Sequence, residues 1–278
     1  CDGVRCDMAM LSLPDVIAQT WGDRMRPIDG TPPVDDPLWP VAISHVRRRW
    51  PGFVFLAEAY WDLEWRLQQQ GFDYTYDKRL YDRLVQGLAR PVREHLYAGL
   101  DFQGHLARFL ENHDEPRAAT AFTPETHRAA AVITFLSPGL RFLHQGQREG
   151  RQVRIPTHLR RGPGEPVDFS LSSFYDALLD CLRDPAFRLG HWQLLDVQSA
   201  WEGNQSNDAF VAFSWSGPQD SRRLAVVNYA DHQSQCYVRL PWDDLGGKSW
   251  ILHDMLGTAV YNREGDDLSV QGLYLALP

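Results

Sequence analysis

Three segments of this sequence place a carboxylate at the C-terminal end of a predicted strand, and their order and spacing constrain the fold more than any other feature. The segments are 2–7 (DGVRCD), 55–61 (FLAEAYW) and 109–117 (FLENHDEPR). Asp7 lies 51 residues before Glu58, and Glu58 lies 56 residues before Asp114. An eight-stranded β/α barrel of about 250 residues takes roughly 30 residues for each strand–helix unit. The first interval therefore fits one unit with an insert, and the second fits two.

Short apolar runs alternate with helical patterns over the first two thirds of the chain. Strand candidates occupy residues 53–57, 72–76, 107–110 and 140–144. Helix candidates occupy residues 61–70, 78–88, 124–136 and 171–183. Thr123 followed by Pro124 is typical of a helix start, because Thr caps the helix and Pro suits its first position. Alternation of this kind predicts a parallel sheet in an α/β fold.

Two predicted loops and one change in the pattern of apolar runs divide the chain further. Residues 26–40 hold five of the 18 prolines, and residues 147–167 are rich in Gly, Arg and Pro, so both predict loops. After about Phe187 the apolar runs become short and are separated by turn residues. This pattern predicts an all-β module that begins near Arg188.

Charge, hydrophobicity and cysteine content exclude several kinds of binding partner and structural site. The net charge of −8 makes nucleic acid an unsuitable partner, because an acidic protein repels phosphates. No apolar run approaches the roughly 18–20 residues of a membrane span. The cysteines show no CxxC or Cys/His cluster, which predicts neither a disulfide scaffold nor a zinc site and favours a reducing compartment, the cytoplasm. They are Cys1, Cys6, Cys181 and Cys236.

Paired carboxylates at strand ends suit one chemistry well. Retaining glycosidases need two carboxyl groups about 5–5.5 Å apart, one as nucleophile and one as proton donor. Arg5 lies two residues before Asp7, so on a strand both side chains share a face and the guanidinium holds the carboxylate charged. The proton donor needs an apolar setting, and Glu58 lies between Ala57 and Ala59.

Each segment by itself has a simpler interpretation. Asp7 resembles a helix cap after a strand, and the pair His113–Asp114 resembles a cap before Glu115. Glu58 by itself fits a surface ion pair. The three segments in this order and at these intervals favour a common active site instead.

The three segments resemble conserved regions two, three and four of the α-amylase superfamily, glycoside hydrolase family 13. Residues 136–146 (LSPGLRFLHQG) resemble the segment at that family's eighth strand. The resemblance implies a partial TIM (β/α)8 barrel, strands four to eight, over residues 1–187. It implies a C-terminal antiparallel β-sandwich domain over residues 188–278.

The resemblance also implies residue roles and a substrate. Asp7 is expected as the nucleophile, Glu58 as the acid/base and Asp114 as the carboxylate that grips sugar hydroxyls in the transition state. The further expected substrate contacts are Arg5, His113, Tyr60, Trp61 and Arg117. The expected reaction is double displacement at α-1,4-glucosidic bonds of starch, glycogen or maltooligosaccharides. Two alternatives remain open, an α-glucan transglycosylase and a non-catalytic α-glucan-binding or scaffold homologue.

The sequence departs from the family pattern at several places. Met10 and Leu11 stand where the family often has Lys-His, and Gln147 stands where a Glu is common. The family's region one falls before Cys1, so we expect the N-terminal barrel half as a missing partner of this chain. Calcium, if the protein uses it, is expected in that part, and no metal or other cofactor is expected here. The isolated 278-residue chain is accordingly expected to be an inactive fragment.

Overall fold

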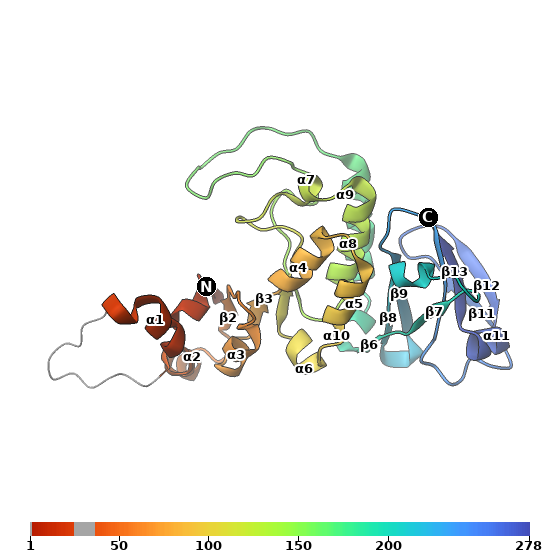
Figure 1. The fold of residues 1–278 in the computed structure, drawn as a ribbon, viewed down its shortest axis with the longest axis horizontal. Helices are drawn as coiled ribbons and strands as arrows, with labels where there is room; N and C mark the ends of the chain where they lie inside the picture. The colour runs from red at the N-terminus through yellow and green to blue at the C-terminus, as the bar shows by residue number, and fades with distance from the viewer. Residues whose placement is uncertain (1, 25–36) are drawn as a thin grey trace. The chain divides into compact units, whose positions relative to one another are not determined.

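The computed structural model describes residues 2–24 and 37–278, which divide into two compact units (Figure 1). Unit 1 comprises Cys1–Lys78, Gly99–Arg108 and Gly139–Phe142. Unit 2 comprises Arg79–Ala98, Phe109–Pro138 and Leu143–Pro278.

A five-stranded parallel sheet forms the centre of unit 1. Its strands follow one another in chain order, β1-β2-β3-β4-β5. They are β1 (Gly3–Cys6), β2 (Val54–Ala57), β3 (Tyr74–Tyr76), β4 (Leu106–Arg108) and β5 (Leu140–Arg141). Because all neighbours are parallel, the carboxyl ends of the five strands lie at one edge of the sheet. The predicted parallel α/β architecture is confirmed.

The helices of unit 1 bury an apolar core against this sheet. They are α1 (Pro14–Trp21), α2 (Leu38–Arg49) and α3 (Glu64–Gln69), and unit 1 also contains α6 (Leu100–Gln103). Ile43 of α2 and Leu67 of α3 pack in one cluster with Phe55 of β2. The ring of Trp39 meets Phe72 edge-on, with the ring centroids 4.9 Å apart.

The predicted loop over residues 26–40 is wrong at its C-terminal end. Helix α2 begins at Leu38, so Pro40 lies in its first turn. Proline is tolerated there because the backbone N–H of a first-turn residue has no partner within the helix. Residues 26–36 of this prediction lie outside the described part of the chain.

One charged pair is fully buried within unit 1. The Nε of Arg108 donates to Asp77 Oδ2 at 3.1 Å, and its Nη2 donates to Gln103 Oε1 at 2.8 Å. Burial lowers the pKa of the Arg108 guanidinium, and the Asp77 carboxylate opposes that change. The pair fixes the end of β4 against the segment that follows β3.

Unit 2 begins with helices. They are α4 (Lys78–Val85, whose first residue belongs to unit 1), α5 (Ala89–Leu96), α7 (Ala118–Ala121), α8 (Pro124–Leu136), α9 (Phe169–Cys181) and α10 (Ala186–Leu189). Thr123 caps α8, and its hydroxyl accepts a hydrogen bond from the Thr126 amide, as the sequence predicts. Helices α8 and α9 lie side by side (Figure 1), joined by the contact of His127 with Tyr175.

The remainder of unit 2 is a β-sheet domain, as the short apolar runs after Phe187 predict. Its strands are β6 (His191–Leu194), β7 (Val197–Ser199), β8 (Phe210–Ser216), β9 (Arg222–Asn228), β10 (Ser234–Val238), β11 (Ser249–His253), β12 (Val260–Glu264) and β13 (Leu273–Leu277). They form the sheets β6-β8-β9, β13-β10-β7 and β11-β12, all antiparallel. Helix α11 (Gly265–Val270) precedes β13. Phe210 of β8 and Cys236 of β10 share one core, so two of the sheets pack on each other.

Specific hydrogen bonds connect this β-sheet domain to the helices of unit 2. Trp215 Nε1 donates to the Leu136 carbonyl at 2.7 Å. The Tyr229 hydroxyl donates to the Leu84 carbonyl, also at 2.7 Å. Both bonds are buried, so the β-sheet domain and these helices form one unit. The start of the β domain at residue 188 stays a prediction.

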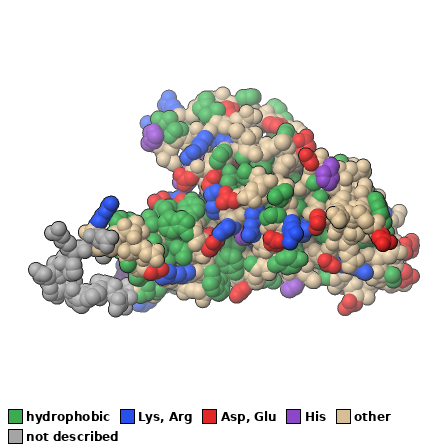
Figure 2. All heavy atoms as spheres, viewed as in Figure 1, with side chains coloured by type: hydrophobic (Ala, Val, Ile, Leu, Met, Phe, Trp, Pro, Cys, Tyr) green, Lys and Arg blue, Asp and Glu red, His purple; other side chains and the backbone are tan. Residues whose placement is uncertain are grey.

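The surface is mixed in charge on the face that Figure 2 shows. Lys and Arg side chains alternate there with Asp and Glu side chains. Within residues 2–24 and 37–278, no helix combines the length and the apolar character that a membrane span requires.

Candidate active site

The pairing of β1 with β2 brings Asp7 and Glu58 to neighbouring strand ends. Cys6 lies opposite Ala57 in the register, so the two carboxylates each follow the last residue of a parallel strand. Backbone bonds continue past the strands, because the Glu58 amide donates to the Cys6 carbonyl and the Ala9 amide donates to the Glu58 carbonyl, both at 3.0 Å. The two segments are therefore held together at the carboxyl edge of the sheet.

Glu58 is a buried carboxylate with three hydrogen-bond donors. Only 3% of the residue is exposed. Arg5 Nη2 lies 3.0 Å from Oε1, and the Tyr60 hydroxyl donates to the same oxygen at 3.0 Å. The Met8 amide donates to Oε2 at 2.7 Å. The sequence predicted an apolar setting for Glu58, and this is wrong. The flanking alanines are buried, but the carboxylate itself is surrounded by polar donors from other segments.

Arg5 connects the two carboxylates. Its Nη1 bonds Asp7 while its Nη2 bonds Glu58, so one guanidinium serves both acids. Burial opposes the charge on Arg5, but hydrogen bonds with Tyr76 and Asp7 raise its pKa above the ordinary value. Asp7 differs from Glu58 in exposure, because 76% of its side chain is open to solvent. The Arg5–Asp7 pair that the two-residue spacing predicts is confirmed.

Three residues that lie close in the chain to Asp7 and Glu58 have a left-handed backbone conformation. Met8 has φ 43°, which turns its amide toward Glu58. Trp61 and Asp62, just after Tyr60, have φ 64° and 61°. Such a conformation costs non-glycine residues about 1–2 kcal/mol each, and strain of this kind gathers at functional sites. Trp61 presents an aromatic side chain that is 62% exposed.

Asp114 belongs to unit 2 and lies in a turn that Asn112 organises. The buried Asn112 Oδ1 accepts the Asp114 amide at 2.8 Å and the Glu115 amide at 3.0 Å. The Nε2 of His113 lies 3.0 Å from Asp114 Oδ2. The Asp114 side chain is half-exposed. The turn therefore presents a carboxylate and an imidazole together, and their contact with a substrate stays a prediction.

Arg117 lies in a buried ion pair that the sequence did not predict. Its Nη1 lies 3.0 Å from Oε1 of Glu111, which is fully buried. The other Glu111 oxygen accepts the Ala118 amide at 2.6 Å, at the start of α7. His144 Nδ1 completes the set at 2.9 Å from Glu111 Oε1. These contacts give Arg117 a structural role inside unit 2. Its contact with a substrate stays a prediction.

A chain of side-chain hydrogen bonds leads onward from His144. The His144 amide donates to Gln147 Oε1 at 3.4 Å, and Gln147 Nε2 donates to the Tyr175 hydroxyl at 2.8 Å. That hydroxyl lies 2.9 Å from His127 Nε2. Gln147, where the family often has Glu, is thus a buried link between two helices and a loop.

The structure places the predicted residues in two groups. Unit 1 brings together Asp7, Glu58, Arg5 and Tyr60, with Trp61 exposed beside them in the chain. Unit 2 brings together His113 and Asp114. Sequence reasoning missed the Met8 amide, Asn112 and Glu111. A backbone donor has no sequence pattern, but an Asn two residues before an Asp is a recognisable turn former.

The described residues contain no group of three or more His, Cys, Asp or Glu side chains that could hold a metal ion. The calcium expected outside this chain stays a prediction.

No protein-family model matches this sequence, and no curated protein sequence matches it. Solved structures match its fold. A noncanonic maltogenic α-amylase, AmyB, from Thermotoga neapolitana matches with a TM-score of 0.67 at 18% identity, over 94% of this chain and 56% of that chain. The α-amylase GTA from Geobacillus thermoleovorans, complexed with acarbose, matches with a TM-score of 0.66 at 19% identity, over 86% and 54%. A debranching enzyme from Nostoc punctiforme, soaked with acarbose, matches with a TM-score of 0.65 at 16% identity, over 100% and 55%.

The chain therefore spans about half the length of the solved structures it matches, and it shares with them the α/β fold of α-amylases, a parallel sheet together with a β-sheet domain.

Proposed function

We propose that this chain carries the catalytic carboxylates of a retaining glycosidase that cleaves α-1,4-glucosidic bonds in starch, glycogen or maltooligosaccharides. One observation carries the proposal. A single guanidinium, Arg5, pairs with both Asp7 and Glu58 at adjacent ends of parallel strands. Two acids held by one cation are close together, as a retaining mechanism requires.

Exposure supports the two proposed roles. Asp7 is open to solvent, so it is the proposed nucleophile that attacks the anomeric carbon. Glu58 is buried and is the acid that gives its proton to the leaving glycosidic oxygen. Glu58 then takes a proton from water, and the resulting hydroxide displaces the sugar from its ester with Asp7. The Tyr60 hydroxyl can donate or accept, so it stays bonded to Glu58 in either protonation state.

Asp114 and His113 are proposed to bind sugar hydroxyls of the substrate. The resemblance of their segment, residues 109–117, to conserved region four of the α-amylase superfamily supports this role. The half-exposed Asp114 carboxylate has oxygens that accept from sugar hydroxyls. Trp61 is proposed as an aromatic surface for a sugar ring, because its side chain is exposed directly after Tyr60.

We also propose that the five strands are strands four to eight of a (β/α)8 barrel whose N-terminal half is a further partner of this chain. The strand order supports this, because barrel strands are parallel and follow chain order. The coverage of about half of each solved structure supports it as well. In a closed barrel the first and last strands pair, so β1 and β5 are the edges that such a partner would cover.

The test uses the complete protein and maltoheptaose. Proton NMR of the first products should show the α-anomer, because a double displacement retains configuration. The Asp7→Asn variant should lose roughly four orders of magnitude in turnover, whereas Asp15→Asn, an exposed acid of the same unit, should keep it. β-Anomeric products or near-normal turnover by Asp7→Asn would contradict the proposal.

The same experiment separates the two alternative functions. Products longer than maltoheptaose indicate an α-glucan transglycosylase, in which a sugar replaces water in the second step. Binding of maltoheptaose without any product indicates a non-catalytic binding or scaffold homologue. Hydrolysis products alone support the glycosidase.

A further inference from the structure

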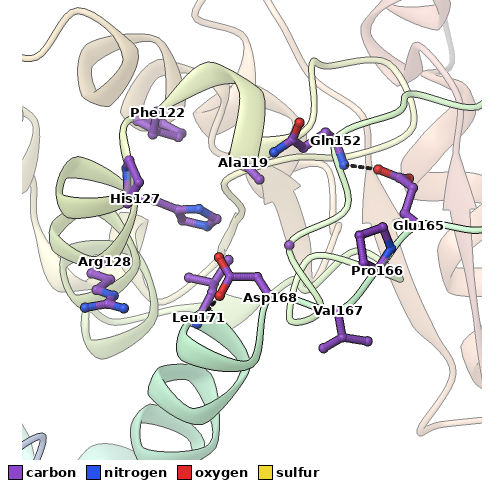
Figure 3. A pocket seen from close by; sticks show the side chains of 12 residues that line it. Ala119, Phe122, His127, Arg128, Gln152, Glu165, Pro166, Val167, Asp168 and Leu171 are labelled. Atoms are coloured by element: carbon purple, nitrogen blue, oxygen red, sulfur yellow. Dashed lines mark hydrogen bonds between the residues drawn. The ribbon is translucent and has the colours of Figure 1, made fainter.

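Unit 2 contains a cavity that the proposed chemistry does not use. Its volume is about 310 Å³, which is at the lower end of the range for small-molecule sites. Figure 3 shows it between the start of α8, the start of α9 and the loop over residues 150–168. The His127 ring and the Asp168 carboxylate point into it, and Phe122 and Leu171 add apolar surface.

One wall of this cavity carries a carboxylate oxygen without a donor among the described residues. Glu165 Oε2 accepts the Gln152 amide at 2.7 Å and the Val153 amide at 3.2 Å. These two bonds fix the carboxylate, as Figure 3 shows for Gln152. Glu165 Oε1 is buried and has no hydrogen-bond partner within the part of the chain that the structure describes. A bound ligand with a hydroxyl would satisfy it.

The other polar groups of the wall have mixed charge. Asp168 adds a second carboxylate, of which one oxygen accepts the Leu171 amide at 2.9 Å. Arg128 adds a cation, which donates to the Ser170 hydroxyl at 2.6 Å. Burial, together with the charge of Arg128, lowers the pKa of His127 to about 4, so this imidazole is neutral at neutral pH.

This mixture selects the class of ligand. The two carboxylates, Glu165 and Asp168, outnumber the single guanidinium of Arg128, so an anion would be repelled. A neutral hydroxyl group can donate to the carboxylates and accept from the guanidinium. The apolar surface of Phe122 and Leu171 suits the C–H face of a ring.

We infer that this cavity is a second binding site, separate from the carboxylates of Asp7 and Glu58, for one neutral sugar unit. That the sugar is glucose, at the end of an α-glucan or free, rests on the proposed function.

The test uses the complete protein with Glu58→Gln to prevent turnover. Glucose and maltotriose are added separately at millimolar concentration, and amide hydrogen exchange is followed over residues 150–171. Slower exchange there is expected with at least one of the sugars. Protection by glucose and maltotriose alike indicates a free sugar unit, and protection by maltotriose alone indicates a chain end. No protection by either sugar would overturn the inference.

Matched variants locate the binding. Glu165→Gln should weaken binding about tenfold, because a bond to a charged acceptor is lost. Glu125→Gln makes the same change at an exposed position of α8 outside the cavity and should leave binding unchanged. Val167→Trp fills the cavity mouth from a half-exposed position and should abolish binding while circular dichroism stays the same. Unchanged binding in both Glu165→Gln and Val167→Trp would overturn the site.

The outcome is independent of catalysis. If the complete protein shows no turnover but residues 150–171 are protected by a sugar, the cavity site stands and the proposed function fails. If turnover is normal and protection is absent, the proposed function stands and the cavity site fails. Equal protection by the anion gluconate would contradict the exclusion of anions.

Discussion

Glu58 in unit 1 and Glu111 in unit 2 are alike in nearly every local respect. Each is a buried carboxylate near a strand end, and each contacts an arginine, another polar side chain and a backbone amide. They differ in what their arginine does. Arg5 also holds the exposed Asp7, whereas Arg117 turns its other donors to the carbonyls of Gln145 and Arg151. A buried Glu–Arg pair is thus weak evidence of a site, and a second, solvent-facing acid on the same arginine is the stronger sign.

The largest expected effect concerns Glu58. Glu58→Gln should lower turnover of maltoheptaose by roughly ten-thousandfold, because the proposed acid/base is lost. Glu111→Gln should leave turnover per folded molecule within a few fold. Chromatography of products at matched concentrations of folded protein measures both. Equal losses in the two variants would remove the distinction between the two carboxylates.

The free energy of unfolding should respond more strongly to the Glu111 variant than to the Glu58 variant. Glu111→Gln should lower the free energy of unfolding by about 3–5 kcal/mol, because the buried Arg117 loses its counter-charge. Urea unfolding at pH 7 measures this, with the exposed Glu125→Gln as control. A loss below about 1 kcal/mol would show that Arg117 finds another partner, and the comparison would then rest on exposure alone.

The network around Glu111 should also respond to pH through His127. The pKa of this imidazole is lowered to about 4 in the folded protein, against 6.5 as its ordinary value, mainly by burial. The unfolded chain therefore binds more protons between these values, so stability is present above about pH 6.5 and falls as the pH drops toward 4. The contribution is roughly 3 kcal/mol.

Two histidine variants isolate that contribution. Between pH 7 and pH 4.5 the wild-type protein should lose more unfolding free energy than His127→Gln does. The exposed His191→Gln should behave as the wild type. Parallel loss in wild type and His127→Gln would place the pH dependence elsewhere.

The smallest effect is expected at Tyr60. Tyr60→Phe removes one of three donors to Glu58 and should lower kcat/KM by roughly fivefold, the value of about one hydrogen bond. The exposed Tyr97→Phe is the control. An unchanged kcat/KM would reduce Tyr60 to a packing role.

The sequence predicted those helices and strands that are determined by residues close together in the chain. Thr123 and Pro124 fixed the start of α8, and the apolar run before Glu58 predicted β2. The exposed β12 has no apolar alternation and was not predicted. Helix α5 was also missed, because Pro91 lies in its first turn and obscures the pattern.

The site shows the same division between local and distant causes. The Arg5–Asp7 pair follows from a two-residue spacing on a strand, so sequence reasoning found it. The Met8 amide reaches Glu58 across 50 residues, and His144 reaches Glu111 across 33. Such contacts depend on how strands pair and loops return. For this reason the polar setting of Glu58 and the buried position of Arg117 were not predicted.

The hydrogen bonds from Gln147 to His127 have a direction. An amide nitrogen can only donate, so Gln147 Nε2 must give its proton to the Tyr175 oxygen. The Tyr175 oxygen has one proton and two lone pairs, so His127 Nε2 accepts that proton when it is bare and donates to the same oxygen when it is protonated. Nitrogen-15 NMR of the ring reports which tautomer is present. The direction of the Tyr175–His127 bond is therefore set by which nitrogen of one imidazole is bare, whereas the bond from Gln147 keeps its direction.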